Sequence, residues 1–182
     1  MKMIEVDKII FLDVDGVLNS DQWSKWCFHH IDFIKNGGSK MFDPKCVERI
    51  INVCESTGAY IVMSSSWRMW SLKQTLKNLT SKRDLRPILE KLVGITPRTD
   101  KRHRGKEIKY FLDCCEKQNF YTDSGEQLSD DRFKFSINPK YIIIDDDEDM
   151  LEEQLPHFLH TDFMVGFTDK DMEKTIKKLN EE

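Results

Sequence analysis

The sequence predicts a three-layer α/β/α sandwich of the Rossmann-like type, in which a parallel sheet lies between two layers of helices. Three mainly apolar stretches without alternation, residues 8–13, 59–63 and 140–144, indicate strands buried on both faces. A helical pattern separates the first two, and strand–helix–strand order produces a parallel pair through a right-handed crossover. Polar or acidic residues follow each stretch, and the carboxyl ends of parallel strands share one edge of a sheet. We therefore expect one domain over residues 1–182 with its functional groups at that edge.

Composition and charge narrow the class of protein. The chain has 182 residues, of which 39% are hydrophobic and 33% charged, and its net charge of -4 argues against a global basic field for nucleic acid. No apolar run reaches the length of a membrane span, and the first residues lack a signal-peptide pattern. Five cysteines without a C-x-x-C pair indicate reduced thiols, so we expect a cytoplasmic protein.

Residues 20–42 form a small insertion after the first strand. They combine aromatic and basic residues and contain the pair Gly37-Gly38. Two interpretations stay open: a surface segment that packs its aromatic residues onto the core, or a lid that contacts substrate beside the sheet edge. In the second interpretation, Trp23 and Trp26 would stack on a base of the substrate.

The remaining elements follow from local signals. Asp43 as N-cap and Pro44 in the first turn begin a helix, and Gly58 ends it. Apolar spacing predicts helices over 70–79 and 85–92, a short strand at 93–95, and a helix after the basic run 100–106. Residues 119–138 are polar and aperiodic, which predicts a short insertion or loop. A turn at 150–155, a short strand at 158–161 and a helix over 169–179 complete the chain.

The three strand ends carry residue types suited to phosphoryl transfer. Asp13 and Asp15 follow the first strand, Ser64, Ser65 and Ser66 the second, and the acidic run 145–149 the third. Crowded carboxylates repel one another unless a cation joins them, and Mg²⁺ prefers such oxygen ligands. The basic run falls between the last two strands. Together these supply a nucleophile, a metal site, a hydroxyl donor and a fixed cation.

These motifs resemble those of the haloacid dehalogenase-like (HAD) phosphatases. The resemblance rests on Asp13-Val14-Asp15-Gly16-Val17, the serine-ended strand and Ile142-Ile143-Ile144-Asp145-Asp146, and it spans the chain from Ile9 to about Leu179. Ser65-Ser66-Trp67-Arg68 and the acidic run are more narrowly similar to small HAD proteins related to the HAD domains of Swiss-Army-Knife RNA-repair proteins. The resemblance implies a HAD-like fold with minimal cap insertions.

The resemblance also implies catalytic roles for the two acids of the first motif. Asp13 would be the nucleophile that forms an aspartyl-phosphate, and Asp15 the general acid and then the general base. Asp13, the backbone carbonyl of Asp15, and Asp146 or Asp145 would hold Mg²⁺.

The phosphate-binding groups are assigned by the same resemblance. Ser65 would bind a phosphoryl oxygen, with Ser64 the next candidate, and Ser66 and Gly16 would also lie at the substrate. The basic residue that would clamp the phosphate is left open: Arg104 is preferred, followed by Lys106 and then Lys101. An arginine there departs from the lysine usual in the superfamily.

We therefore expect a Mg²⁺-dependent phosphomonoester hydrolase. The small insertions predict an open site, which suits a nucleotide, a nucleic-acid end or another large phosphorylated substrate. No membrane and no obligate protein partner is inferred. Two alternatives are a receiver-like domain, whose acids form an adjacent pair and whose phospho-acceptor lies on a later strand, and a non-catalytic phosphate-binding protein on the same fold. The D-x-D spacing and the full set of functional residue types favour the enzyme.

Overall fold

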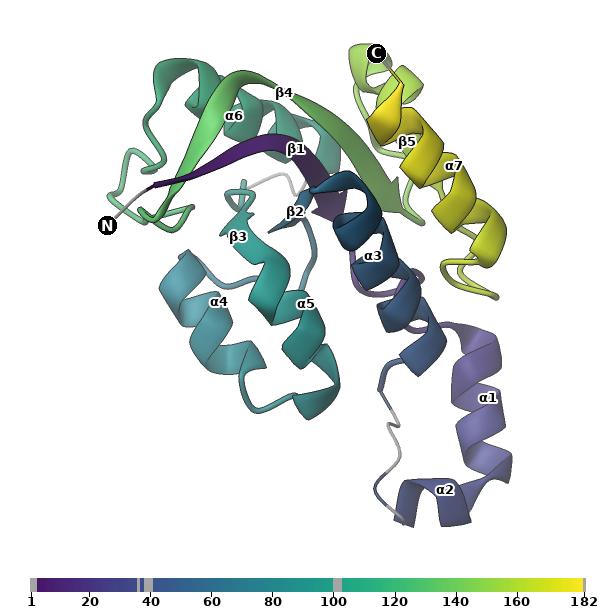
Figure 1. Ribbon diagram of the computed structural model, residues 1–182. Coiled ribbons are helices and arrows are strands. Elements are labelled where there is room, and N and C mark those ends of the chain that lie inside the picture. The colour runs from purple at the N-terminus through teal and green to yellow at the C-terminus, as the bar shows by residue number, and fades with distance from the viewer. Residues whose placement is uncertain (1–2, 36, 38–40, 100–102, 182) are drawn as a thin grey trace.

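The computed structural model describes residues 3–35, 37, 41–99 and 103–181. Five strands among them form one sheet in the order β3-β2-β1-β4-β5, and each neighbouring pair is parallel (Figure 1). The strands are β1 (Ile4–Leu12), β2 (Tyr60–Met63), β3 (Leu92–Ile95), β4 (Phe133–Asp145) and β5 (Phe158–His160). The predicted parallel α/β fold is confirmed.

Helices cover both faces of this sheet. Helix α6 (Arg104–Lys117) packs on β4, while α3 (Pro44–Thr57) lies beside both α5 (Arg86–Lys91) and α7 (Asp169–Asn180) on the opposite face (Figure 1). The core between the layers is continuous, and Ile9 to Leu12 in the central strand are fully buried. Helix α4 (Leu72–Leu79) and the 3₁₀ segments η1 (Arg83–Leu85) and η2 (Glu152–His157) complete the connections.

Local capping signals placed α3 correctly. The Asp43 side chain accepts a hydrogen bond from the Lys45 backbone N–H, and Pro44 occupies the first turn. Gly58 ends the helix in the left-handed conformation at φ 74°, where a side chain would be strained.

The beginnings of the two central strands differ from the sequence prediction. Strand β1 begins at Ile4 rather than near residue 8, and β4 begins at Phe133, so the predicted loop over 119–138 is wrong in its last part. Ile4, Glu5 and Val6 pair with residues 133–135. These strand portions combine exposed residues with the buried Val6 and Phe135, so backbone pairing rather than a continuous apolar run defines them.

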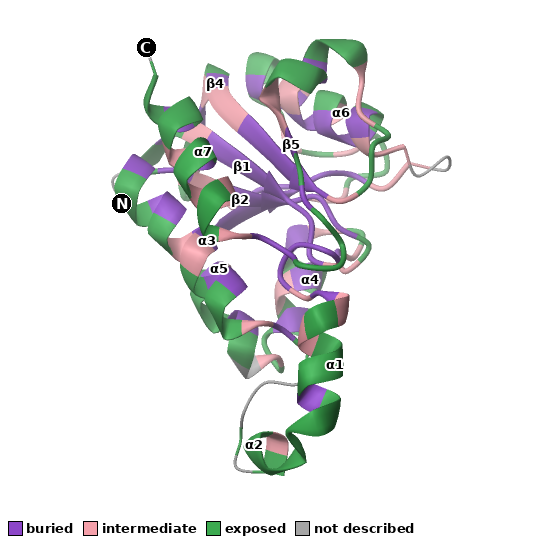
Figure 2. Cartoon of the chain, turned by 90° about the vertical axis from the view of Figure 1, so that its right-hand side faces the viewer, coloured by how far each residue is buried: buried purple, intermediate pink, exposed green. Residues whose placement is uncertain are grey.

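The insertion over 20–42 contains α1 (Asp21–His29) and α2 (Ile31–Lys35), which extend away from the sheet (Figure 2). Ser20 caps α1 by accepting a hydrogen bond from the Trp23 N–H. Backbone hydrogen bonds from Asp21 to Phe163 (3.2 Å) and from Gln22 to Met164 (3.1 Å) anchor its first turn.

Two expectations about the chain's chemistry can be compared with the fold. All five cysteines are buried and none forms a disulfide, in agreement with reduced thiols. None of the helices in the described residues combines the length and the apolar character needed to cross a bilayer.

The aromatic cluster under α6 generates a stability prediction. The ring of Phe111 contacts Phe11 and Phe135 with centroids 5.8 and 5.4 Å away, and its side chain is fully buried. Phe111→Ala should lower the free energy of unfolding by about 3–5 kcal/mol through lost burial and a cavity. Phe28→Ala is the matched control, because Phe28 is 75% exposed, and it should change stability by less than about 0.5 kcal/mol. Urea unfolding of both variants measures these changes. Equal losses of unfolding free energy in the two variants would contradict this packing.

Candidate active site

Three strand ends converge at the carboxyl edge of the sheet. The Asp13 N–H donates to the Ile144 carbonyl at 3.0 Å, and the Ser64 N–H donates to the Leu12 carbonyl at 2.9 Å. These bonds continue the parallel pairing beyond the end of β1. The residues after β1 and β2 are therefore held beside Asp145 at the end of β4.

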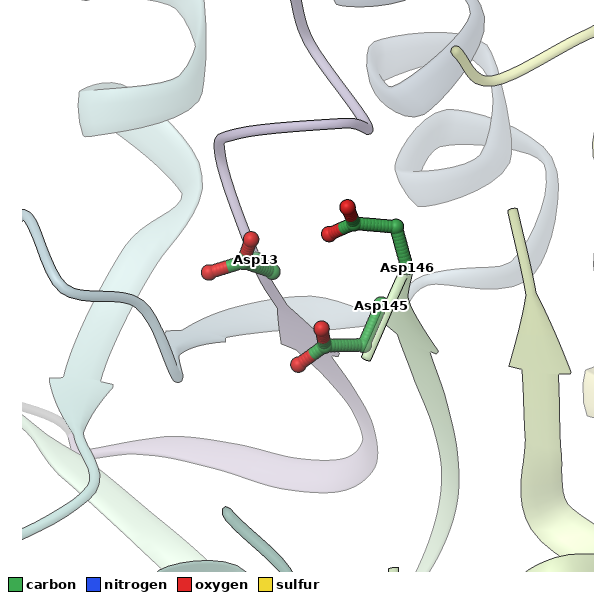
Figure 3. A group of neighbouring side chains, drawn as sticks. All are labelled: Asp13, Asp145 and Asp146. Carbon is green, nitrogen blue, oxygen red and sulfur yellow. The ribbon is translucent and has the colours of Figure 1, made fainter. Parts of the chain in front are cut away.

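Three carboxylates gather at this edge. Oxygens of Asp13, Asp145 and Asp146 all lie within 4.8 Å of one another (Figure 3). Asp13 and Asp145 are buried, whereas Asp146 is partly exposed. Convergent carboxylate oxygens with one open side match the ligand preference of Mg²⁺. The residues present therefore fit a Mg²⁺ ion.

The pKa values of all three carboxyl groups are raised, so their negative charge is incompletely compensated. Burial raises the pKa of Asp13 to about 6, although Arg104 and the Ser65 hydroxyl oppose the shift. Burial, followed by the charge of Asp13, raises the pKa of Asp145 to about 8. Burial and the neighbouring Asp147 also raise the pKa of Asp146. A cation among these groups would favour their ionised forms.

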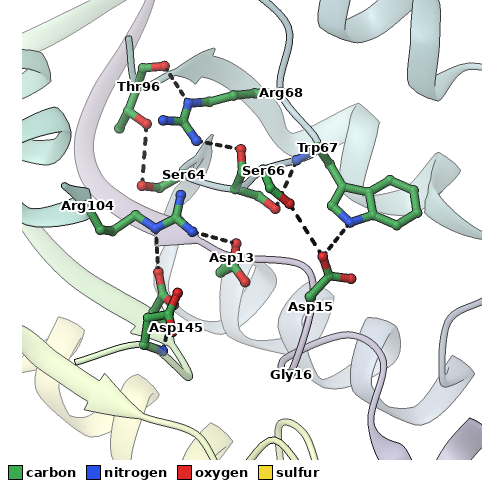
Figure 4. A network of polar contacts seen from close by, with 12 residues as sticks. Asp13, Asp15, Gly16, Ser64, Ser66, Trp67, Arg68, Thr96, Arg104 and Asp145 are labelled. Carbon is green, nitrogen blue, oxygen red and sulfur yellow. Dashed lines mark hydrogen bonds and ion pairs between the residues drawn. The ribbon is translucent and has the colours of Figure 1, made fainter. Parts of the chain in front are cut away.

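Arg104 is the cation that reaches this cluster. Its Nη2 lies 3.2 Å from Asp13 Oδ1 and its Nε lies 2.9 Å from Asp145 Oδ2 (Figure 4). The neighbouring carboxylates keep the guanidinium charged against the effect of its burial, so its pKa is raised. Lys106, the second candidate, is exposed in the first turn of α6, and Lys101 lies outside the described residues.

The loop after β4 fixes the helix that carries Arg104. The Arg104 and Gly105 N–H groups donate to the side chain and the backbone carbonyl of Asp149, at 2.8 and 3.1 Å. Gln154 donates to the Gly105 carbonyl at 2.8 Å. A Cβ on residue 105 would come within 2.6 Å of the Leu151 nitrogen, so only glycine permits this approach.

Asp15 is held by donors from two segments. Its Oδ2 accepts a hydrogen bond from Trp67 Nε1 at 2.8 Å (Figure 4). Its Oδ1 accepts one from Asn19 Nδ2 at 2.9 Å. Its carboxylate therefore points away from the cluster of Asp13, Asp145 and Asp146. Its backbone carbonyl remains the atom of this residue that is expected to bind the metal ion. Gly16 makes the turn at φ 68°, and a Cβ there would lie 2.3 Å from Asp146 Cγ.

The three serines occupy different environments. The buried Ser65 hydroxyl lies near enough to Asp13 to lower the pKa of its carboxyl against the effect of burial, whereas Ser64 Oγ accepts from Thr96 Oγ1 at 3.4 Å. Ser66 is exposed and its hydroxyl approaches Asp15 Oδ2 at 3.5 Å. Of the three side chains, that of Ser65 is the one in contact with the predicted nucleophile.

A buried ion pair that the sequence did not single out supports these loops. Arg68 pairs with Glu107 of α6, and both side chains are almost fully buried. Arg68 also donates to the backbone carbonyls of Ser65, Thr96 and Pro97. Arg68 was part of the motif Ser65-Ser66-Trp67-Arg68, but no sequence signal pointed to its partner Glu107.

The structure does not bring Trp23 and Trp26 to the carboxylates. Their rings stack on each other with centroids 5.1 Å apart, and the ring of Phe33 packs edge-on against both. They line a separate groove of about 500 Å³ with Pro44 and Val165. The aromatic residues of the insertion thus pack largely on one another.

Comparison with known proteins adds one decisive finding. The family model described as HAD domain in Swiss Army Knife RNA repair proteins matches residues 9–172. The chain belongs to this HAD family. No curated protein and no solved structure matches the chain. Membership in the HAD family implies a phosphatase-like hydrolase, and the matched range includes all three strand ends of the site.

The raised carboxyl pKa values generate a prediction about stability and Mg²⁺. The folded state retains protons that the unfolded state releases between about pH 4 and 8, so metal-free stability should fall as the pH rises through this window. Because Mg²⁺ binds ionised carboxylates, it should raise the melting temperature more at pH 8 than at pH 6.

Thermal melts in EDTA and in Mg²⁺ at both pH values measure this. Asp145→Asn should weaken the metal-free pH dependence, while the exposed Asp123→Asn should preserve it. An equal Mg²⁺ effect at the two pH values would count against a metal site at these carboxylates.

Proposed function

We propose that this protein is a Mg²⁺-dependent phosphomonoester hydrolase that works through an aspartyl-phosphate on Asp13, with nucleotides or nucleic-acid ends as its substrates. The observation that carries the proposal is the contact of Asp13 with both Arg104 and Ser65, beside a second acid held ready for proton transfer. Membership in the HAD family supports the same reaction class.

The first chemical step assigns one task to each side chain. A carboxylate oxygen of Asp13 attacks phosphorus, and the bond from phosphorus to the ester oxygen breaks. Asp15 gives its proton to that leaving oxygen. Arg104 and Ser65 donate hydrogen bonds to phosphoryl oxygens, whose negative charge they stabilise.

The second step regenerates the enzyme. Asp15, now ionised, accepts a proton from water, which attacks the phosphorus of the aspartyl-phosphate and releases inorganic phosphate. A Mg²⁺ ion held by Asp13, Asp145 or Asp146 and the Asp15 carbonyl would neutralise charge on the phosphoryl group. Asp15 supplies the acid–base group needed for turnover, which favours a phosphatase over a receiver-like domain.

Removing the nucleophile tests the reaction. Asp13→Asn should lower kcat on p-nitrophenyl phosphate by at least about 1,000-fold, because no covalent intermediate can form. EDTA should abolish wild-type activity and Mg²⁺ should restore it. Asp123→Asn, on the exposed loop after α6, serves as the control and should retain wild-type activity. An inactive wild type, or an Asp13→Asn variant as active as wild type, would refute the assignment.

The indole that holds Asp15 generates a second prediction. Trp67→Phe removes the Nε1 donor but keeps an aromatic ring against Phe42, whose centroid lies 5.4 Å from that of Trp67. A hydrogen bond to a charged group contributes about 1.5–3 kcal/mol, so kcat/KM on glycerol phosphate, which reports the steps up to the aspartyl-phosphate, should fall by about 10-fold or more. On p-nitrophenyl phosphate, whose leaving group needs no proton, kcat/KM should fall much less. Equal losses of kcat/KM on both substrates would indicate a purely structural role.

A further inference from the structure

A cavity of about 400 Å³ adjoins the carboxylate site. It extends from Arg104 along the loops that follow β2 and β3, where Ser66, Trp70 and Arg98 line it. Asp147 and Asp149 line it from the loop after β4. Because Arg104 also contacts Asp13, a substrate whose phosphate lies at Asp13 would have room for its leaving group in this cavity.

Trp70 offers the cavity a largely exposed ring with an arginine beside it. Its side chain is 56% exposed, and the guanidinium carbon of Arg98 lies 5.6 Å from the ring centroid. Trp70 precedes α4 in the connection from β2, and the N–H groups of the nearby Met69 and Leu72 donate to Thr75 Oγ1 and to the Gln127 carbonyl at 2.8 and 2.9 Å. A large aromatic ring exposed beside an arginine is a suitable platform for stacking a planar group.

Arg98 differs from the other two arginines of the cavity. Arg68 is paired with Glu107, and Arg104 is paired with two aspartates. Within the described ranges, no carboxylate lies at ion-pair distance from Arg98, which donates to the Ser66 backbone carbonyl at 3.2 Å. Arg104 is assigned to the scissile phosphate, so the charge of Arg98 is available to neutralise a second anionic group of the ligand.

The acids of the cavity restrict where an anion can bind. Glu107 is neutralised by Arg68, and Asp149 accepts the Arg104 N–H at the beginning of α6. Asp147 is exposed on the opposite loop and would repel an anion. An anionic group is thus directed to the side formed by Arg98 and Ser66.

We propose that the Arg98 and Trp70 side of this cavity is a leaving-group subsite, which binds a second phosphate at Arg98 and a planar base on Trp70. The ligand class is a nucleotide with a phosphate besides the scissile one, such as a nucleoside 3′,5′-bisphosphate. This inference rests on the proposed phosphatase function and specifies its substrate.

A series of substrates that differ first by a base and then by a second phosphate tests the subsite. Wild-type kcat/KM should rise from glycerol phosphate to nucleoside monophosphates, tested as both 3′ and 5′ isomers, and again to the bisphosphate. The Trp70→Ala variant should have a kcat/KM on the order of 10-fold lower than wild type on every nucleotide, as expected for a lost stacking contact. Its kcat/KM on glycerol phosphate should stay close to that of wild type. Arg98→Gln should erase the advantage of the bisphosphate over the monophosphates.

Binding without turnover separates this proposal from the catalytic one. Calorimetry of the nucleoside 3′,5′-bisphosphate with wild type in EDTA, where turnover is blocked, should show binding that Trp70→Ala and Arg98→Gln both weaken on the order of 10-fold. A wild type that hydrolyses no phosphomonoester but shows this binding pattern would refute the phosphatase alone. Equal loss on all substrates in folded variants, or unchanged bisphosphate binding, would overturn the subsite.

Discussion

One guanidinium shared by two buried carboxylates is the interaction on which this site depends. Asp13 and Asp145 end neighbouring parallel strands, so the sheet itself forces their negative charges together. Arg104 contacts both but supplies a single positive charge. The cluster must therefore retain a proton or take up a cation, and its raised carboxyl pKa values reflect that choice. A carboxylate cluster with this imbalance fits a cation such as Mg²⁺.

The position of the guanidinium depends in turn on the packing of a helix end. Gly105 lets α6 approach the loop after β4, and Asp149 satisfies the first N–H groups of the helix. One turn further, Glu107 pairs with Arg68, whose other bonds reach the loops after β2 and β3. This buried network fixes the relative positions of the loops, and breaking one partner would leave an uncompensated charge. The Ser65 carbonyl belongs to it, so the network also orients the hydroxyl that contacts Asp13.

The sequence predicted the features that depend on neighbouring residues in the chain, such as the central strands and the caps of α3. Apolar runs located the central strands, and the Asp43 and Gly58 caps located α3. The strand-end position of Asp13 predicted the convergence with Asp145, because parallel strands align their carboxyl ends. Pairing between distant segments was not predictable, which is why the partly exposed beginnings of β1 and β4 were missed. The contact between Trp67 and Asp15 likewise depends on how two loops meet, and nothing in either loop alone indicates it.

The sequence also could not decide which basic residue reaches Asp13, because that again depends on how distant segments pack. Arg104 and Lys106 are equivalent in a basic run, and only the docking of α6 turns one toward Asp13 and leaves the other exposed. The cavity beside them takes its described lining from the loops after β2, β3 and β4 and from the first turn of α6, and none of it from α1 or α2. In the proposed enzyme, these loops and this helix end therefore select the substrate. Charged groups that are already held in place lower the entropic cost of binding the phosphate.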